Sequence, residues 1–116
     1  MSAVVQVTRL PAPVQGLVNR LKASSVVDEI IVFGSAVKGT MTPQSDVDIL
    51  VVASNEGEAE ELLRRRTQLT ARIIPRVDLV VTSQEELVQA RGERFAFLGA
   101  VREQGEVVYS KKAGGS

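Results

Sequence analysis

The sequence of 116 residues contains no cysteine and no histidine. Without cysteine there is no disulfide framework, no thiolate nucleophile and no zinc site built from thiolates. Without histidine the Ser-His-Asp and Cys-His mechanisms, zinc sites built from imidazoles and the usual general base are excluded. Any catalysis must therefore use carboxylates, lysine, tyrosine, backbone donors or a bound metal ion.

Long apolar runs and an excess of one charge are also missing. No apolar stretch approaches the roughly 18 residues of a membrane span, and the first residues lack the basic and apolar pattern of a secretory signal. We therefore expect no contact with a membrane and a cytoplasmic location, which the lack of cysteine also fits. The 14 Lys and Arg residues balance 14 Asp and Glu residues, which argues against direct binding to nucleic acid.

Helix and strand patterns alternate along the chain, which predicts one α/β (α+β) domain over residues 1–110 and a disordered tail over 111–116. The connection between the first two strands is barely long enough for a parallel crossover, which favours a mixed sheet. A short edge strand is possible within residues 4–7. The stripe of Phe95, Leu98 and Val101, with Phe97 beside it, is expected in the core, and an interface for part of it is the alternative. We expect strands over 26–33, 45–53, 76–81 and 107–109. Helices are expected over 13–22, 35–38 and 56–74, the last with Leu62, Leu63, Leu69 and Ile73 facing inward. Two further helices are expected, one from Ser83 towards Gly92 and one from Gly92 to Gly105.

Three aspartates interrupt the apolar strands. Asp46 and Asp48 are two residues apart, so both point to one face with Cα atoms roughly 6.5 Å apart. Asp78 lies in the strand over 76–81, and all three carboxylates converge if the two strands are neighbours. Close like charges repel, and a divalent cation removes that repulsion. Hard oxygen ligands suit Mg²⁺ or Mn²⁺, and three carboxylates can hold two such ions roughly 4 Å apart for in-line displacement at phosphorus.

A glycine-serine step follows the first strand. Gly34 lets the backbone approach a ligand closely, and Ser35 is expected to cap a short helix whose first N–H groups favour phosphate. Lys38 is a candidate phosphate contact, and Ser45 is a candidate either for phosphate binding or for shaping the turn. A phosphate-binding loop next to a metal site predicts phosphoryl or nucleotidyl transfer from a nucleoside triphosphate.

Two other phosphate-binding motifs do not fit this stretch. Gly34 and Gly39 have the spacing of a P-loop, but Thr40 stands where that motif needs lysine. A dinucleotide-binding fingerprint also needs a glycine between these two, at position 36, where this sequence has alanine. Neither a P-loop nor a Rossmann fingerprint is therefore present.

The spacing of these residues resembles a known signature. The steps Gly34-Ser35, Gly39 and Ser45-Asp46-Val47-Asp48 are similar to the pattern Gly-Ser-x(3)-Gly-x(5)-Ser-Asp-x-Asp of the DNA polymerase β-type nucleotidyltransferase superfamily. The later Asp78 resembles the third carboxylate of that superfamily, and the short chain resembles its minimal nucleotidyltransferase branch in particular. The resemblance implies a polymerase β-like fold, with a mixed four-stranded sheet flanked by helices.

The resemblance also implies roles for the residues. Asp46 and Asp48 would hold both metal ions, while Asp78 would hold the catalytic ion and help to deprotonate the attacking hydroxyl. Gly34 and Ser35 would bind the outgoing phosphates. The reaction would transfer a nucleoside monophosphate, which we predict to be AMP, from ATP or another triphosphate to an acceptor. Many members carry arginine at the two positions that are Ala36 and Lys38 here.

The acceptor is expected on another chain, because the sequence is short for a separate acceptor-binding domain. For the minimal branch the resemblance implies a partner of the helical HEPN class and a role as antitoxin in a toxin–antitoxin pair; a homodimer is the other arrangement considered. Two alternatives remain open at this point. One is a non-catalytic binding subunit that neutralises its partner by occupation, and the other is nucleotidyl transfer to a small molecule such as an aminoglycoside.

Overall fold

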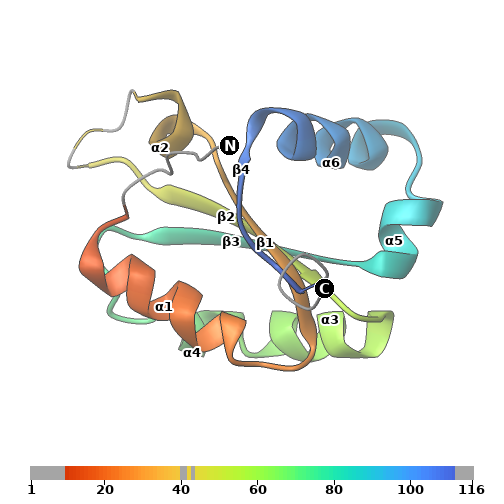
Figure 1. The fold of residues 1–116 in the computed structure, drawn as a ribbon, viewed down its shortest axis with the longest axis horizontal. Coiled ribbons are helices and arrows are strands. Elements are labelled where there is room, and N and C mark those ends of the chain that lie inside the picture. Colours follow the sequence, from red (N-terminus) through yellow and green to blue (C-terminus); the bar gives the residue numbers. More distant parts are fainter. Residues whose placement is uncertain (1–9, 40–41, 43, 112–116) are drawn as a thin grey trace.

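Four strands form one sheet in the computed structural model, which describes residues 10–39, 42 and 44–111. Their order across the sheet is β3-β2-β1-β4, so β1 and β2 are central and β3 and β4 are edges (Figure 1). The strands are β1 (Val27–Phe33), β2 (Val47–Ala53), β3 (Val77–Ser83) and β4 (Glu106–Ser110).

The sheet is mixed, as predicted. β1 runs antiparallel to both β2 and β4, whereas β2 and β3 are parallel. The connection from β1 to β2 contains only the four-residue helix α2, and β2 returns antiparallel. The longer connection that follows β2 contains α3 and α4 and leads to the parallel strand β3. The predicted four-stranded mixed sheet with flanking helices is confirmed.

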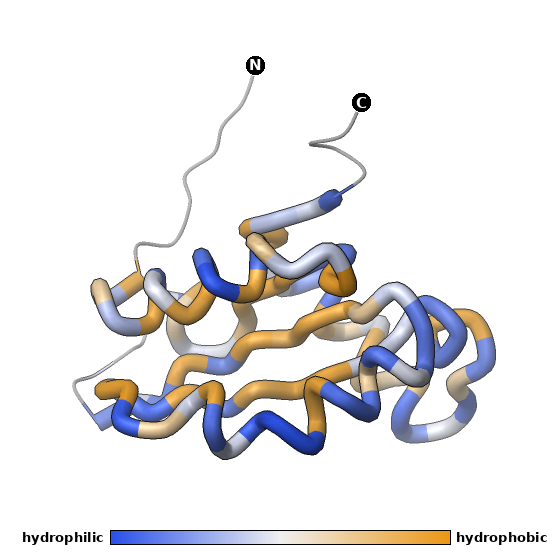
Figure 2. The backbone as a smooth tube through the Cα atoms, turned by 90° about the horizontal axis from the view of Figure 1, so that it is seen from below, coloured by the Kyte–Doolittle hydropathy of each residue, from blue (hydrophilic) through white to orange (hydrophobic). Residues whose placement is uncertain are grey.

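Helices cover both faces of the sheet (Figure 1). On one face, α1 and α3 pack against the larger apolar cluster, and on the other α6 packs against Ile31 and Leu50. Figure 2 shows the hydrophobic strands in the middle of the molecule and alternating hydrophobic and hydrophilic residues along the helices. The helices are α1 (Ala12–Lys22), α2 (Ser35–Lys38), α3 (Glu56–Arg64), α4 (Arg66–Thr70), α5 (Gln84–Gln89) and α6 (Gly92–Gln104).

The helix α1 forms where the apolar stripe predicts it. Its four buried residues, at positions 14, 17, 18 and 21, recur at the helical period and face the sheet. Pro13 lies in its first turn, where a missing N–H costs nothing, and Arg20 and Lys22 lie in its last turn, where cations favour the helix dipole. The sequence therefore accounts for both the ends and the buried face of this helix.

The strand β2 is apolar on both faces beyond Asp48. Val47, Ile49 and Val51 belong to the cluster under α1 and α3, while Leu50 packs under α6. Each of these side chains is completely buried. Because β2 is rigidly held on both sides, it fixes the position of the aspartate at its start.

The long helix predicted over 56–74 is wrong, because two shorter helices occupy that stretch. α3 ends before Arg65, whose backbone is no longer helical, and α4 ends at Thr70. Arg72 then takes a positive φ of 63°, which reverses the chain towards β3. Leu63, which we expected to face the core, is 46% exposed, because α3 buries the side that carries Ala59 and Leu62.

The start of α5 follows its predicted cap, and α6 departs from its predicted buried face. Ser83 Oγ accepts a hydrogen bond of 3.0 Å from the N–H of Glu86. The break before α6 falls just before Gly92, which is the first residue of that helix. Leu98 is buried as expected, but Phe95 is 60% exposed, so its predicted place in the core is wrong. Phe95 lines a pocket between α5 and α6, together with Leu87 and Leu98.

Two predictions lie outside the described residues. They are the short edge strand within 4–7 and the disordered tail, of which only Lys111 is described. The Lys111 ammonium donates a hydrogen bond of 2.7 Å to the carbonyl of Ser25. Among the helices of the described ranges, none is long and apolar enough to cross a membrane.

Candidate active site

Two of the three aspartates lie side by side on neighbouring strands. Asp48 of β2 and Asp78 of β3 are direct partners in the parallel register, so their Cα atoms are about 4.8 Å apart. Both side chains lie on the face that carries α6, because Leu50 and Val80, two residues further along each strand, pack there. The predicted neighbourhood of the two strands is confirmed.

The electrostatic surroundings of Asp48 are unfavourable for a carboxylate. Burial raises the pKa of Asp48, and the negative charges of Asp78 and then of Asp46 raise it further. Both other carboxylates are therefore close enough to repel it. The start of β2 is a concentrated negative centre that a cation would relieve.

Asp46 lies just before β2 and is turned towards the next strand. Its carboxylate is 3.5 Å from the guanidinium of Arg76, in an exposed ion pair. The backbone holds the same two segments together, since the N–H of Val47 donates to the carbonyl of Arg76 at 2.9 Å. In the part of the chain that the structure describes, no three acidic side chains are already arranged as a ligand set for a metal ion.

Gly34 brings the backbone of the loop directly against Asp48. Its φ of 76° and ψ of −147° belong to a region that only glycine occupies readily. A Cβ atom built on Gly34 would collide with Oδ2 of the Asp48 carboxylate. Glycine is therefore required here both by the backbone conformation and by the space available.

Ser35 does not cap the short helix α2, contrary to our prediction. Gly34 occupies the cap position without a side-chain hydrogen bond, and Ser35 is the first helical residue. A serine caps a helix only from the extended residue before it, and Gly34 fills that position. The carbonyl of Ser35 accepts the N–H of Gly39, which closes the helix in a left-handed conformation.

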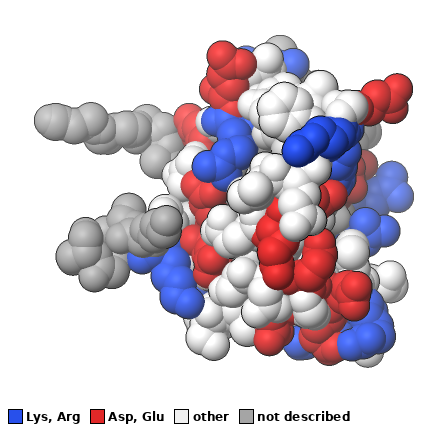
Figure 3. Space-filling model, turned by 90° about the vertical axis from the view of Figure 1, so that its right-hand side faces the viewer, with Lys and Arg blue, Asp and Glu red and all other residues white. Residues whose placement is uncertain are grey.

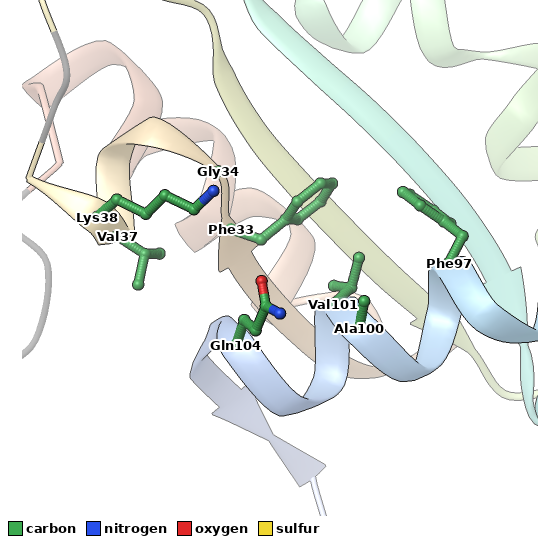
Figure 4. A pocket seen from close by; sticks show the side chains of 8 residues that line it. All are labelled: Phe33, Gly34, Val37, Lys38, Phe97, Ala100, Val101 and Gln104. Carbon is green, nitrogen blue, oxygen red and sulfur yellow. The ribbon is translucent and has the colours of Figure 1, made fainter.

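Lys38 and Ser45 have different surroundings. Lys38 is exposed, and its side chain extends along the mouth of a pocket towards Gly34 (Figure 4). The hydroxyl of Ser45 accepts a hydrogen bond of 2.9 Å from the N–H of Thr42 and lies 3.2 Å from its Oγ1. Ser45 therefore shapes the turn before β2, one of the two roles considered for it.

The pocket beside Gly34 was not foreseen from the sequence. It has a volume of about 200 Å³ and lies between α2 and α6 (Figure 4). Phe33 and Phe97 form one wall, with ring centroids 6.0 Å apart and an edge-to-face angle of 78°. Gln104 and Lys38 supply polar groups at the opposite side.

The comparisons with known proteins agree with this geometry. A family model described as a nucleotidyltransferase domain matches residues 14–108. The chain belongs to this family. The matched range includes β1, β2, β3, the first part of β4 and every predicted site residue, so the family match spans the whole candidate site.

Two solved structures share the polymerase β-like fold. A provisionally assigned nucleotidyltransferase from Sulfolobus solfataricus is 20% identical with a TM-score of 0.54, and the match covers 87% of this chain and 80% of that one. A structure described as a toxin–antitoxin with AMP-PNP is 22% identical with a TM-score of 0.51, covering 85% of this chain and 72% of that one. No curated protein matches the sequence.

The sequence contains only weak signals for three residues of the pocket, namely Phe33, Phe97 and Gln104. Phe33 immediately precedes Gly34 and faces Asp48 across the strands, so its place beside the site could be read from an antiparallel pairing of the two strands. Phe97 was predicted to lie in the core with Phe95 and Leu98, but it keeps 37% of its surface exposed and lines the pocket. Gln104 belongs to no motif. These residues meet because α6 crosses the sheet over β1, which local sequence does not encode.

Proposed function

We propose that the chain is a Mg²⁺-dependent nucleotidyltransferase, which transfers AMP from ATP to a hydroxyl group on a partner protein. One observation carries the proposal. Asp48 and Asp78 are in register on neighbouring strands, and the backbone of Gly34 lies against the Asp48 carboxylate. Carboxylates for a cation and a close loop backbone for phosphates are thus adjacent, within a chain of the nucleotidyltransferase family.

The donor set fits a hard divalent cation. Asp46, Asp48 and Asp78 offer only carboxylate oxygens, which Mg²⁺ and Mn²⁺ prefer. The raised pKa of Asp48 reflects repulsion from the other two carboxylates, which a cation offsets. When bound, such an ion supplies neutralisation of the charge on the phosphate oxygens. Two ions are expected, as in other sites of three carboxylates used for displacement at phosphorus.

The reaction is a displacement at the α-phosphorus. The acceptor oxygen forms a new bond to that phosphorus while its proton passes to Asp78. The bond from phosphorus to the oxygen bridging the α- and β-phosphates breaks, and pyrophosphate leaves with the electron pair. The exposure of Asp78 on the edge strand β3 supports this role, because an acceptor can approach it from solvent.

The other predicted residues serve the outgoing phosphates. Gly34 and Ser35 are proposed to bind them, and the hydroxyl of Ser35 makes no hydrogen bond to another described residue. Lys38 is proposed as a point charge at the mouth of the site, since it forms no ion pair within the described part of the chain. Ser45 supports the loop through its hydrogen bonds to Thr42.

A partner protein of the HEPN class is the proposed acceptor, and the chain is proposed to act as its antitoxin. Support comes from the structural likeness to the toxin–antitoxin with AMP-PNP. Figure 3 shows acidic side chains gathered on the face that carries α3 and α5, where Glu56, Glu60 and Glu85 are exposed. This charge suits a protein surface with lysine and arginine better than nucleic acid.

A non-catalytic antitoxin is the second candidate. Its support is Ala36, which stands where many relatives carry a phosphate-binding arginine, and the ion pair of Asp46 with Arg76. Such a protein would neutralise its partner by occupation alone.

Co-purification from the native host followed by a transfer assay tests the proposal. The protein, its co-purified partner and Mg²⁺ are mixed with each of the four triphosphates, and the partner mass is measured. We expect one AMP added by the wild type and none by the double variant D46A/D48A. Equal partner masses with both proteins would contradict the enzymatic proposal, and neutralisation that survives in the double variant would favour occupation.

A further inference from the structure

The pocket between α2 and α6 is continuous with the candidate active site. Phe33, in its wall, is the direct antiparallel partner of Asp48, so the two side chains lie on the same face about 5 Å apart at their Cα atoms. Gly34 lines the pocket and also lies against the Asp48 carboxylate. A ligand that contacts both the pocket and the Asp48 carboxylate therefore spans only the neighbouring strands β1 and β2.

The order of the strands divides the site into two sides. Asp78 on β3 lies on one side of Asp48, and Phe33 on β1 lies on the other. In-line displacement places the attacking and leaving groups on opposite sides of the phosphorus. If the acceptor enters over the edge strand β3, the Phe33 side is left for the nucleotide.

The chemistry of the pocket suits a flat heterocycle. Phe33 and Phe97 offer an aromatic wall, and Phe97 keeps 37% of its surface exposed, so a ring can still pack against it. The carboxamide of Gln104 projects into the pocket (Figure 4), and it makes no hydrogen bond to another residue of the described chain. Apolar walls with a single free amide are typical of a site for a small, partly polar ring.

The amide of Gln104 also favours one base. A carboxamide presents an acceptor and a donor side by side, which matches the amino group and adjacent ring nitrogen of adenine. Lys38, the positive group at the mouth, is on the side of the phosphate loop and away from the Phe97 wall (Figure 4). The charges of a nucleotide and its base would thus meet different parts of one continuous site.

We infer that this pocket binds the adenine ring of the triphosphate, with Phe97 packed against the ring and Gln104 paired to its polar edge. The inference rests on the proposed function, since it names the base recognised at the same site. It makes Gln104 and Phe97 determinants of nucleotide specificity that touch no phosphate.

Calorimetric binding of ATP, GTP and inorganic tripolyphosphate, each with Mg²⁺, tests the inference. Tripolyphosphate carries the phosphates without a base, so it isolates the phosphate loop. We expect ATP to bind more tightly than GTP, and the variants Q104A and F97A each to weaken ATP binding about 5- to 10-fold. Their affinity for tripolyphosphate should stay that of the wild type, and F97Y should restore ATP binding.

Gln89→Ala is the matched control, because Gln89 is an exposed glutamine at the end of α5 that lines no part of this pocket. Its ATP affinity should equal that of the wild type, and circular dichroism checks that all variants are folded. Unchanged ATP binding in Q104A and F97A, or an equal loss of ATP and tripolyphosphate binding, overturns the inference while leaving the proposed function intact. A wild type that binds no triphosphate overturns both.

Discussion

The backbone of Gly34 lies against the carboxylate of Asp48, with no space for a Cβ atom between them. The contact joins the end of β1 to the start of β2, and thereby the phosphate loop to the proposed metal ligands. Such close packing keeps the loop and the aspartate in a fixed relation before any ligand arrives. A substitution at Gly34 therefore has consequences for both stability and binding.

We predict that G34A lowers the free energy of unfolding by about 2 to 4 kcal/mol, because it combines backbone strain with overpacking. G39A is the matched control. Gly39 also has a positive φ, of 77°, but a Cβ there would meet no atom of another described residue within 4 Å. It should cost only about 1 kcal/mol. Urea denaturation measures both, and equal losses would show that the contact with Asp48 has no effect on stability.

The raised pKa of Asp48 predicts a pH dependence of the metal-free protein. An acid whose pKa is higher in the folded state opposes folding once it ionises, so its unfavourable effect grows as the pH rises from about 4 through the folded pKa. In EDTA at pH 7, D48N should therefore be more stable than the wild type, and the difference should shrink towards pH 4. E103Q, an exposed control on α6, should show no such trend. A D48N variant less stable than the wild type at pH 7 would refute this electrostatic description.

The carboxylate of Glu86 has the opposite effect on stability. Hydrogen bonds from Arg94 lower its pKa, with a further contribution from Thr82, whose hydroxyl donates at 2.5 Å. Its stabilising effect is thus complete above the unfolded pKa of about 4.3 and is lost as the pH falls through the folded value.

We predict that E86Q costs about 1 to 2 kcal/mol at pH 7, because one carboxylate joins β3, α5 and α6. The loss should narrow as the pH falls below 4. Urea denaturation of E86Q and of the exposed control E60Q measures it. A loss that is the same at pH 3.5 and pH 7 would contradict a role for the charge.

Much of the fold follows from the sequence, because apolar periodicity and turn residues are local signals. The stripe of α1 and the serine cap of α5 are examples in which a few neighbouring residues determine an element. The break of the helix at Arg65 has no such signal, since arginine suits a helix interior, although α3 and α4 both contact β3.

The candidate site was predictable where it depends on spacing and not where it depends on packing. The prediction that Asp48 and Asp78 lie side by side required only that their two strands be neighbours in the sheet. The turn of Asp46 towards Arg76 depends on a segment 30 residues further along the chain, and Gln104 of the pocket is 56 residues from Asp48. Tertiary placement of this kind leaves no pattern in the chain itself.

A substitution of Asp78 should separate triphosphate binding from AMP transfer. If it accepts the proton of the acceptor hydroxyl, D78N should reduce AMP transfer by at least about 100-fold. Triphosphate affinity should change far less, because D78N leaves Asp46, Asp48 and the loop in place. Calorimetry and the rate of pyrophosphate release measure the two quantities. A variant that keeps the wild-type transfer rate would remove Asp78 from the reaction.

The most direct measurement of the central claim uses ATP labelled at either the α- or the γ-phosphate, with Mg²⁺ and the co-purified partner. Nucleotidyl transfer predicts that the α-label becomes covalently attached to the partner, that the γ-label leaves in pyrophosphate, and that D48N transfers neither. Attachment of the γ-label, or no attachment of the α-label by the wild type, would contradict the account.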